Sequence, residues 1–143
     1  MSDSPHTVRN AEEFLSHVKD VRVEDEEIMV SDVTALFTCI SIDLARRTLE
    51  AAITVDQYLA DNSRLSPTQL LSLVDFCLAS TYFCFGGQIY HQHQGTPMGS
   101  PVSGLTAELV MQHFEKQVLQ GEDMPKLWLR YVDDTFTIIK RQL

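Results

Sequence analysis

The sequence predicts an α+β fold in which helices back an antiparallel sheet, and three observations lead to this prediction. The stretch from Leu127 to Ile139 holds two apolar runs, rich in β-branched and aromatic residues, on either side of a short polar break, which is typical of a β-hairpin. A short apolar run from Ile28 to Ser31 predicts a further strand. Between these strands, apolar residues recur at three- and four-residue spacing, which predicts amphipathic helices.

The predicted helices begin at capping signals. Ser66 and Pro67 fit the cap and the first helical position, and Gln69 completes a capping box. Asn10 is a second cap, with Glu13 at the third position of a capping box.

The chain has 143 residues, of which 44% are hydrophobic. This length corresponds to one domain, with enough apolar residues to bury a core. The predicted helices span about residues 11–18, 42–53, 67–80 and 101–120.

Two further segments lie between the helices. Residues 82–85 and 88–91 are β-prone and flank Gly86 and Gly87, so they predict a tight hairpin. Residues 94–101, QGTPMGSP, hold two glycines and two prolines, which exclude a regular strand or helix. A plain connecting loop is the simplest interpretation. However, a loop that ends at a helix cap is also suited to present backbone amides to phosphate groups.

Three aspartates stand at predicted strand ends. Asp32 follows the strand at residues 28–31, and Asp133 and Asp134 occupy the polar break of the hairpin. On its own the pair is most simply a solvated turn, because aspartate is common in turns. If the two strands pair in one sheet, the three carboxylates become neighbours, and divalent cations relieve their mutual repulsion. Mg²⁺ prefers such oxygen ligands, and two ions about 3.5–4 Å apart are suited to nucleotidyl transfer.

The charge balance limits how such a site reaches its substrate. The chain has 11 Lys and Arg against 20 Asp and Glu, a formal net charge of −9. Proteins that bind a phosphate backbone unaided have a basic face, so a nucleic-acid role requires metal ions or basic segments outside these residues.

No apolar stretch predicts a membrane span, and no secretory signal is recognised. Three cysteines without paired spacing lead us to expect no disulfide partner and an intracellular protein, nuclear or cytoplasmic.

The order of these motifs resembles that of reverse transcriptases. Asp32 with Phe37 five residues later resembles motif A, QGTPMGSP resembles motif B, and YVDD at residues 131–134 resembles motif C. The sequences of the segments SDVTALFT and LRYVDDTF are most similar to those of reverse transcriptases of Penelope-like retroelements, which are relatives of telomerase. The resemblance covers about residues 28–140. It implies a polymerase palm-type antiparallel sheet packed on helices, within an incomplete right-hand polymerase fold.

The resemblance also implies the function and its cofactor. The chain would be the catalytic palm of an RNA-directed DNA polymerase of a retroelement, with residues 25–143 as the palm and residues 1–24 as a flexible or short helical segment. Asp32, Asp133 and Asp134 would be catalytic. These three carboxylates and the carbonyl of Val33 would hold two Mg²⁺ ions, for which Mn²⁺ can substitute.

Further roles follow from the same resemblance. Phe37 would be the steric gate against a ribose 2′-hydroxyl, and the backbone near Ala35 and Leu36 would meet the triphosphate. The partners would be an RNA or DNA template, a primer and dNTPs. The remaining nucleotide-site residues would be Gln94 and Gly95, and the template and primer contacts would be Met98, Gly99, Ser100, Pro101, Tyr131 and Val132.

Some departures and absences modify this expectation. Ser31, Ser41 and Gly104 stand where the family commonly has an apolar or aromatic residue, a proline and a second proline, but none of them is a metal ligand. The basic fingers segment is expected upstream of residue 1 and the thumb downstream of Leu143. We therefore expect the isolated chain to bind Mg²⁺ weakly and not to extend a primer.

Other interpretations stay open. A truncated or domesticated palm could serve as a non-catalytic binding module or be a remnant, and another two-metal phosphotransferase is a third class. Phe37 alone would be read as a core residue. His91, His93 and Cys84 could form a zinc site, which we disfavour because structural zinc sites are normally four-coordinate and no fourth ligand is evident.

Overall fold

The computed structural model describes residues 4–24, 27–31, 35–121 and 124–140. The chain divides into two compact units, one from residues 1–34 and 114–143 and the other from residues 35–113. Each unit is described by itself. The expected palm boundary at residue 24 stays a prediction, since the segments that carry the motifs fall in both units.

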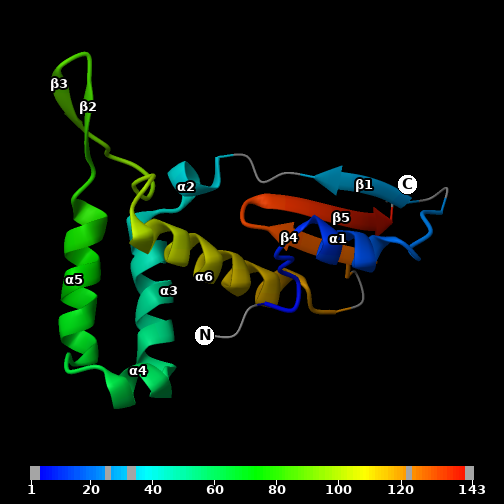
Figure 1. Cartoon of the computed structure of the whole chain (residues 1–143), viewed down its shortest axis with the longest axis horizontal. Helices are drawn as coiled ribbons and strands as arrows, with labels where there is room; N and C mark the ends of the chain where they lie inside the picture. The colour runs from blue at the N-terminus through cyan, green and yellow to red at the C-terminus, as the bar shows by residue number, and fades with distance from the viewer. Residues whose placement is uncertain (1–3, 25–26, 32–34, 122–123, 141–143) are drawn as a thin grey trace. The chain divides into compact units, whose positions relative to one another are not determined.

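The first unit contains a three-stranded antiparallel sheet (Figure 1). Its order is β1-β5-β4, where β1 is Glu27–Ser31, β4 is Leu127–Tyr131 and β5 is Asp134–Lys140. The predicted hairpin is thus confirmed, and the strand before Asp32 pairs with its second arm. One detail differs from the prediction. Tyr131 pairs with Asp134, so the turn is Val132 and Asp133, and Asp134 already belongs to β5.

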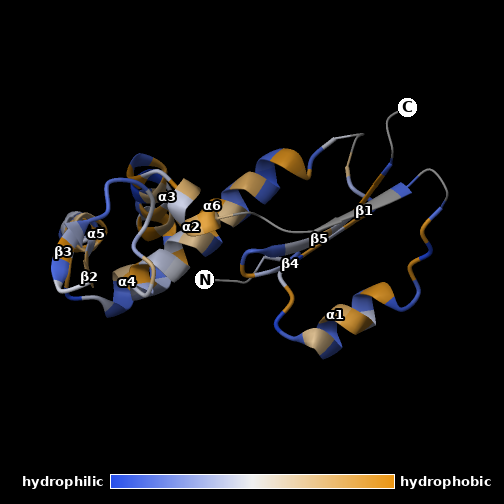
Figure 2. Cartoon of the chain, turned by 90° about the horizontal axis from the view of Figure 1, so that it is seen from above, coloured by the Kyte–Doolittle hydropathy of each residue, from blue (hydrophilic) through white to orange (hydrophobic). Residues whose placement is uncertain are grey.

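Helix α1 (Ala11–Val18) lies along one face of this sheet (Figure 2). The Phe14 ring meets the Phe136 ring of β5 edge-on, with centroids 5.3 Å apart. Asn10 caps the helix as predicted, since its side chain accepts a hydrogen bond from the Glu13 amide. The predicted capping box is incomplete, because the Glu13 carboxylate accepts from the Arg9 backbone amide instead. This hydrogen bond and the nearby Arg9 guanidinium lower the pKa of Glu13.

The second unit is mainly helical (Figure 1). Helices α3 and α5 lie side by side, and the Arg46 guanidinium of α3 binds the Asp75 carboxylate of α5 at 3.0 Å. The capping box at Ser66 and Gln69 is complete, as predicted. Helix α4 was not predicted and begins at its own cap, Asp56. The helices of this unit are α2 (Leu36–Cys39), α3 (Ile42–Val55), α4 (Gln57–Asn62), α5 (Pro67–Ala79) and α6 (Pro101–Val118), whose last residues belong to the first unit.

The second unit also carries a separate two-stranded hairpin, which projects beyond the end of α5 (Figure 1). Its strands are β2 (Tyr82–Phe85) and β3 (Gln88–His91), and every strand residue is exposed. The turn is made by Gly86 and Gly87, both with positive φ, as the sequence predicted. The cysteines are free thiols, and Cys84 on this hairpin is exposed.

Candidate functional site

The tip of the β4–β5 hairpin has a strained backbone. Two-residue hairpin turns require a positive φ at their first turn residue, where glycine is favoured. Here that residue is Val132, with φ of 58°. A β-branched side chain in this region is a true outlier and costs about 1–3 kcal/mol, so the surrounding structure has to hold it. The strain lies next to Asp133.

The two candidate carboxylates of the hairpin differ in exposure. Asp133 is half-buried in the turn, and Asp134 is exposed at the start of β5. Asp32 and Val33 lie outside the described residues. Ser31, which precedes Asp32, pairs with Phe136 of β5, and Phe136 is two residues from Asp134. The strand pairing on which a shared carboxylate site depends is therefore present, while the position of Asp32 itself stays a prediction.

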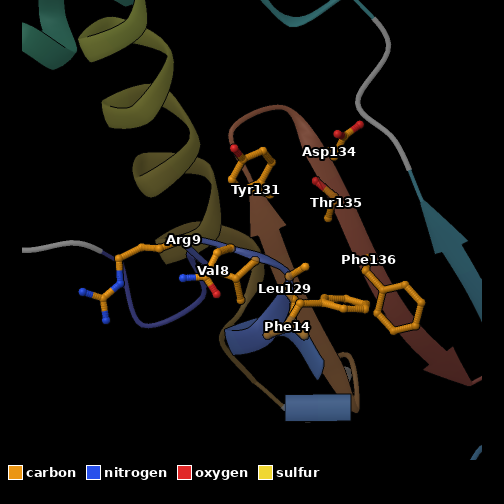
Figure 3. Close-up of a pocket in the computed structure, with 10 residues that line it drawn as sticks. Val8, Arg9, Phe14, Leu129, Tyr131, Asp134, Thr135 and Phe136 are labelled. Atoms are coloured by element: carbon orange, nitrogen blue, oxygen red, sulfur yellow. The ribbon is translucent and has the colours of Figure 1, made fainter. Parts of the chain in front are cut away.

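One face of the hairpin borders a pocket (Figure 3). Side chains alternate along a strand, so Tyr131 and Asp134 share a face with Leu129 and Phe136. Tyr131 and Asp134 lie toward the turn, and Phe14 and Phe136 lie at the other end of the pocket (Figure 3). The cavity has a volume of about 710 Å³. It is lined by Val8, Arg9, Asn10, Ala11, Phe14, Leu129, Tyr131, Asp134, Thr135 and Phe136.

The opposite face of the hairpin rests on a buried ion pair. The side chains of Arg130 and Glu115 are 0% and 3% exposed, and Arg130 Nε donates to Glu115 Oε1 at 2.7 Å. Trp128 Nε1 donates to the same carboxylate at 3.2 Å. Arg130 Nη1 also donates to the backbone carbonyl of Val132 at 3.2 Å. The buried ion pair is thus joined to the strained turn by a hydrogen bond from Arg130.

In the second unit, the loop at residues 94–101 docks on the segment that carries Phe37. The buried Thr96 donates to the Phe37 carbonyl twice, from its amide at 2.8 Å and from its hydroxyl at 3.2 Å. A Cβ added to Gly95 would lie 2.5 Å from the Thr38 Cα, so only glycine fits this approach. Gln94 is exposed beside it, and its carbonyl accepts from the Gln92 side chain. The predicted nucleotide-site residues Phe37, Gln94 and Gly95 are therefore brought together.

A smaller cavity of about 410 Å³ lies on the same segment. Leu36 is buried, and Ala35, the residue before α2, has a left-handed φ of 58°. Ala35 and Val132 are the positive-φ residues other than glycine in the described part of the chain, and both belong to candidate motifs. The cavity is lined by Phe37, Met98, Gly99, Ser100, Pro101, Ser103 and Gly104, so four predicted template contacts line a pocket with the proposed gate.

Solved structures of telomerase from Candida tropicalis match nearly the whole chain. The chain has a telomerase-like fold. For the apo enzyme truncated from its C-terminal domain, the TM-score is 0.65 at 17% identity, covering 96% of this chain and 30% of that one. For telomerase in complex with the TWJ fragment of telomeric RNA, the TM-score is 0.66 at 13% identity, covering 95% and 25%. No protein-family model and no curated protein matches the chain.

The telomerase-like fold agrees with the expected partial polymerase fold. The chain spans between a quarter and a third of the telomerase chains that it matches. At this level of identity the likeness concerns the fold, so the chemistry has to be argued from the residues. None of the described helices is long and apolar enough to cross a membrane.

The donor set suits a hard cation, although it is only partly described. Asp133 and Asp134 offer carboxylate oxygens, the ligands that Mg²⁺ prefers, and Asp134 is exposed while Asp133 is half-buried. Within residues 4–24, 27–31, 35–121 and 124–140, no three His, Cys, Asp or Glu side chains are grouped as a metal site. Asp32 is outside these ranges. The metal site therefore stays a proposal. Cys84, His91 and His93 all lie within the described ranges and are not grouped there, so the zinc site that the sequence disfavoured is not formed.

Sequence reasoning missed Arg130 and Glu115. Both are charged residues at positions that the structure buries almost completely. The available signal was Arg130 itself, a charged residue within the apolar run LWLRY. A buried charge needs a partner, but the sequence does not indicate which of the chain's 20 acidic residues supplies it.

Proposed function

We propose that this chain is the catalytic palm part of an RNA-directed DNA polymerase of a Penelope-like retroelement. The observation that carries the proposal is the pairing of β1 with β5. Strand β1 ends one residue before Asp32, and its last residue pairs with β5 two residues after Asp134. A metal site shared by these carboxylates needs such a pairing. The telomerase-like fold of the chain supports the same reading.

In this proposal Asp32, Asp133 and Asp134 hold two Mg²⁺ ions, with the Val33 carbonyl as a further ligand and Mn²⁺ as a substitute. Bound there, the ions supply activation of the primer 3′-hydroxyl and charge neutralisation at the leaving pyrophosphate. Tyr131 and Val132 lie beneath the primer end. The strained residue of the turn, Val132, directly precedes the proposed ligand Asp133.

The second unit supplies the proposed nucleotide and template contacts. The docking of Thr96 on the Phe37 carbonyl holds the proposed gate against the loop that contains Gln94 and Gly95. Met98 to Pro101 then face the template beside the same pocket. One of the similar telomerase structures contains a fragment of telomeric RNA, which supports RNA as a class of partner here. The full partner set is template, primer and dNTPs.

Metal binding to the 143-residue chain tests the proposal most directly. Mn²⁺ titrated into ¹⁵N-labelled protein should broaden the amide signals around Asp133 first, with weak affinity. Asp133→Asn should weaken this broadening about tenfold or more, because one of the clustered carboxylates is lost. Asp43→Asn, an exposed acid at the start of α3, is the matched control and should leave it unchanged. Broadening that ignores Asp133→Asn would contradict the proposed site.

Primer extension tests the activity itself. The 143-residue chain should not incorporate dNTPs on an RNA template. A longer polypeptide that includes flanking fingers and thumb sequence should do so, and Asp133→Asn should abolish its synthesis. Synthesis by the longer protein with Asp133→Asn would rule out the proposed catalytic role.

The second candidate is a non-catalytic palm that acts as a binding module. One observation favours it: the net charge of −9, which disfavours unaided binding of a polynucleotide. This candidate predicts binding to a protein partner without Mg²⁺ dependence. It also predicts that no flanking sequence restores primer extension.

A further inference from the structure

Arg130 is fully buried inside an apolar strand, and the proposed function gives it no role. Its guanidinium is anchored at Nε by Glu115, whose carboxylate also accepts from Trp128 and from the Ser4 hydroxyl at 2.8 Å. A charge in such a place is costly unless every donor is used. The question is therefore what this arginine does that an apolar residue would not.

The guanidinium is planar, so one anchored nitrogen fixes where the others point. With Nε on Glu115, Nη1 points at the Val132 carbonyl at 3.2 Å. That carbonyl belongs to the residue whose left-handed backbone carries the strain of the turn. A hydrogen bond from a fixed, charged donor stabilises this peptide orientation against the relaxed alternatives that a valine prefers.

A plainer role for Arg130 is to hold the N-terminal segment. Its Nη2 donates to the Thr7 hydroxyl at 3.1 Å, and its backbone exchanges hydrogen bonds with His6 and Val8. These contacts involve other atoms of Arg130 than the bond to Val132. The two roles can thus be separated by substitution, because Thr7 can be changed without touching the turn.

We propose that Arg130 is a positioning residue, which holds the Val132 carbonyl and through it the orientation of the turn that presents Asp133. Glu115 sets the guanidinium in place. The inference rests on the proposed function for what the turn binds, but the positioning itself is a statement about the backbone of residues 132–134. It can be tested whether or not the chain binds metal.

The experiment uses the whole 143-residue chain, ¹⁵N-labelled, with Mn²⁺ as the probe. The main variant is Arg130→Met combined with Glu115→Gln, which removes both charges together and leaves Trp128 an amide oxygen as acceptor. The control is Thr7→Val, which removes another hydrogen bond of Arg130 and leaves the bond to Val132. Val132→Gly is added to each, since glycine adopts the left-handed conformation without strain.

We expect the double variant to keep the amide shifts of β5 from Phe136 onward, while the Val132–Asp134 amides shift and exchange on the microsecond to millisecond timescale. Its Mn²⁺ affinity should fall about tenfold to a hundredfold, as for residues that orient a metal ligand. Thr7→Val should leave both readouts at their wild-type values. Val132→Gly should restore most of the affinity in the double variant, because glycine adopts the left-handed turn without the hydrogen bond from Arg130, which a merely structural role of Arg130 would not produce.

Unchanged shifts and relaxation at residues 132–134 in the double variant would overturn the proposal. If that variant does not fold, Arg130→Lys decides, because lysine keeps the charge beside Glu115 but lacks the rigid fork that reaches Val132. Arg130→Lys should then loosen the turn, and a turn unchanged by it would refute the idea. Wild-type protein without Asp133-dependent Mn²⁺ binding would contradict the proposed function alone, since the turn readout remains.

Discussion

The β2–β3 hairpin turns at two glycines and exposes every strand residue, whereas the β4–β5 hairpin turns at Val132 and Asp133 and buries Leu129 and Arg130. In the first hairpin the turn residues adopt positive φ at no steric cost. In the second, an unsuitable residue is held in place by a buried ion pair. Both hairpins place a positive φ at the first turn residue, and the difference teaches that only in the second is this residue hydrogen-bonded by a buried charged group. That hairpin is the one that carries the candidate carboxylates.

The largest expected effect comes from removing the ion pair on one side only. Arg130→Ala leaves the Glu115 carboxylate buried without its main partner, so we expect the unfolding free energy to fall by about 3–5 kcal/mol. Urea denaturation followed by Trp128 fluorescence measures it. Arg9→Ala, which breaks an exposed pair with Glu13, should cost much less, because solvent screens that pair. Equal losses for the two variants would mean that burial of the pair is unimportant.

The next effect concerns a glycine that is fixed by close contact. Gly95→Ala places a Cβ 2.5 Å from the Thr38 backbone at a φ of 82°, so we expect a loss of at least about 1–3 kcal/mol and release of the loop from Phe37. Thermal unfolding and the amide signal of Thr96 report it. Gly104→Ala in α6 meets nothing within 4 Å and should stabilise by about 0.5–1 kcal/mol. A neutral Gly95→Ala would show that the loop does not dock as described.

Exchanging the two turn types should give small effects of opposite sign. Val132→Gly relieves strain of about 1–3 kcal/mol but adds about 0.5–1 kcal/mol of chain entropy, for a net gain of about 0–2.5 kcal/mol. Gly87→Val places a valine at positive φ in the second turn position of the exposed hairpin, with no buried group to hold it. Amide hydrogen exchange of each hairpin measures both. Tolerance of Gly87→Val without loosening would break the comparison.

The smallest effect is a pH dependence confined to the three-stranded sheet. The Glu24 amide and then Lys126 hydrogen-bond the Glu27 carboxylate of β1 and lower its pKa below the ordinary 4.5. Its contribution is therefore fully present above pH 4.5 and is lost as the pH falls through the lower, folded-state pKa. Unfolding of wild type and Glu27→Gln between pH 5 and about 2 tests this, with a smaller slope expected for the variant. The β2–β3 hairpin has no Asp or Glu and should show no such change.

Much of the fold could be predicted because its signals are local. The caps at Asn10 and Ser66 and the glycine turn at Gly86 and Gly87 act through neighbouring residues, and the structure has all of them. Helix α4 was missed because its cap, Asp56, follows α3 directly and the helical pattern runs on without a break.

The candidate site could be predicted less completely. Periodicity indicated two strands, and their pairing is present, but the left-handed Val132 contradicts local preference and depends on packing from elsewhere. Likewise, Glu115 and Arg130 meet only because the end of a helix lies against a strand. The meeting of Thr96 with Phe37 joins positions 59 residues apart. Such contacts are set by tertiary structure, which a pattern of residue types does not specify.

The bond between Thr96 and Phe37 has a consequence for how sugar selectivity can change. The loop donates hydrogen bonds to the backbone carbonyl of residue 37 and not to its aromatic ring. Any amino acid at this position therefore offers the same acceptor. If the ring does exclude ribose, a smaller side chain would widen the substrate range while the loop stays where it is. The choice of sugar would then depend on the side chain of residue 37, and the position of the loop would depend on the backbone of that residue.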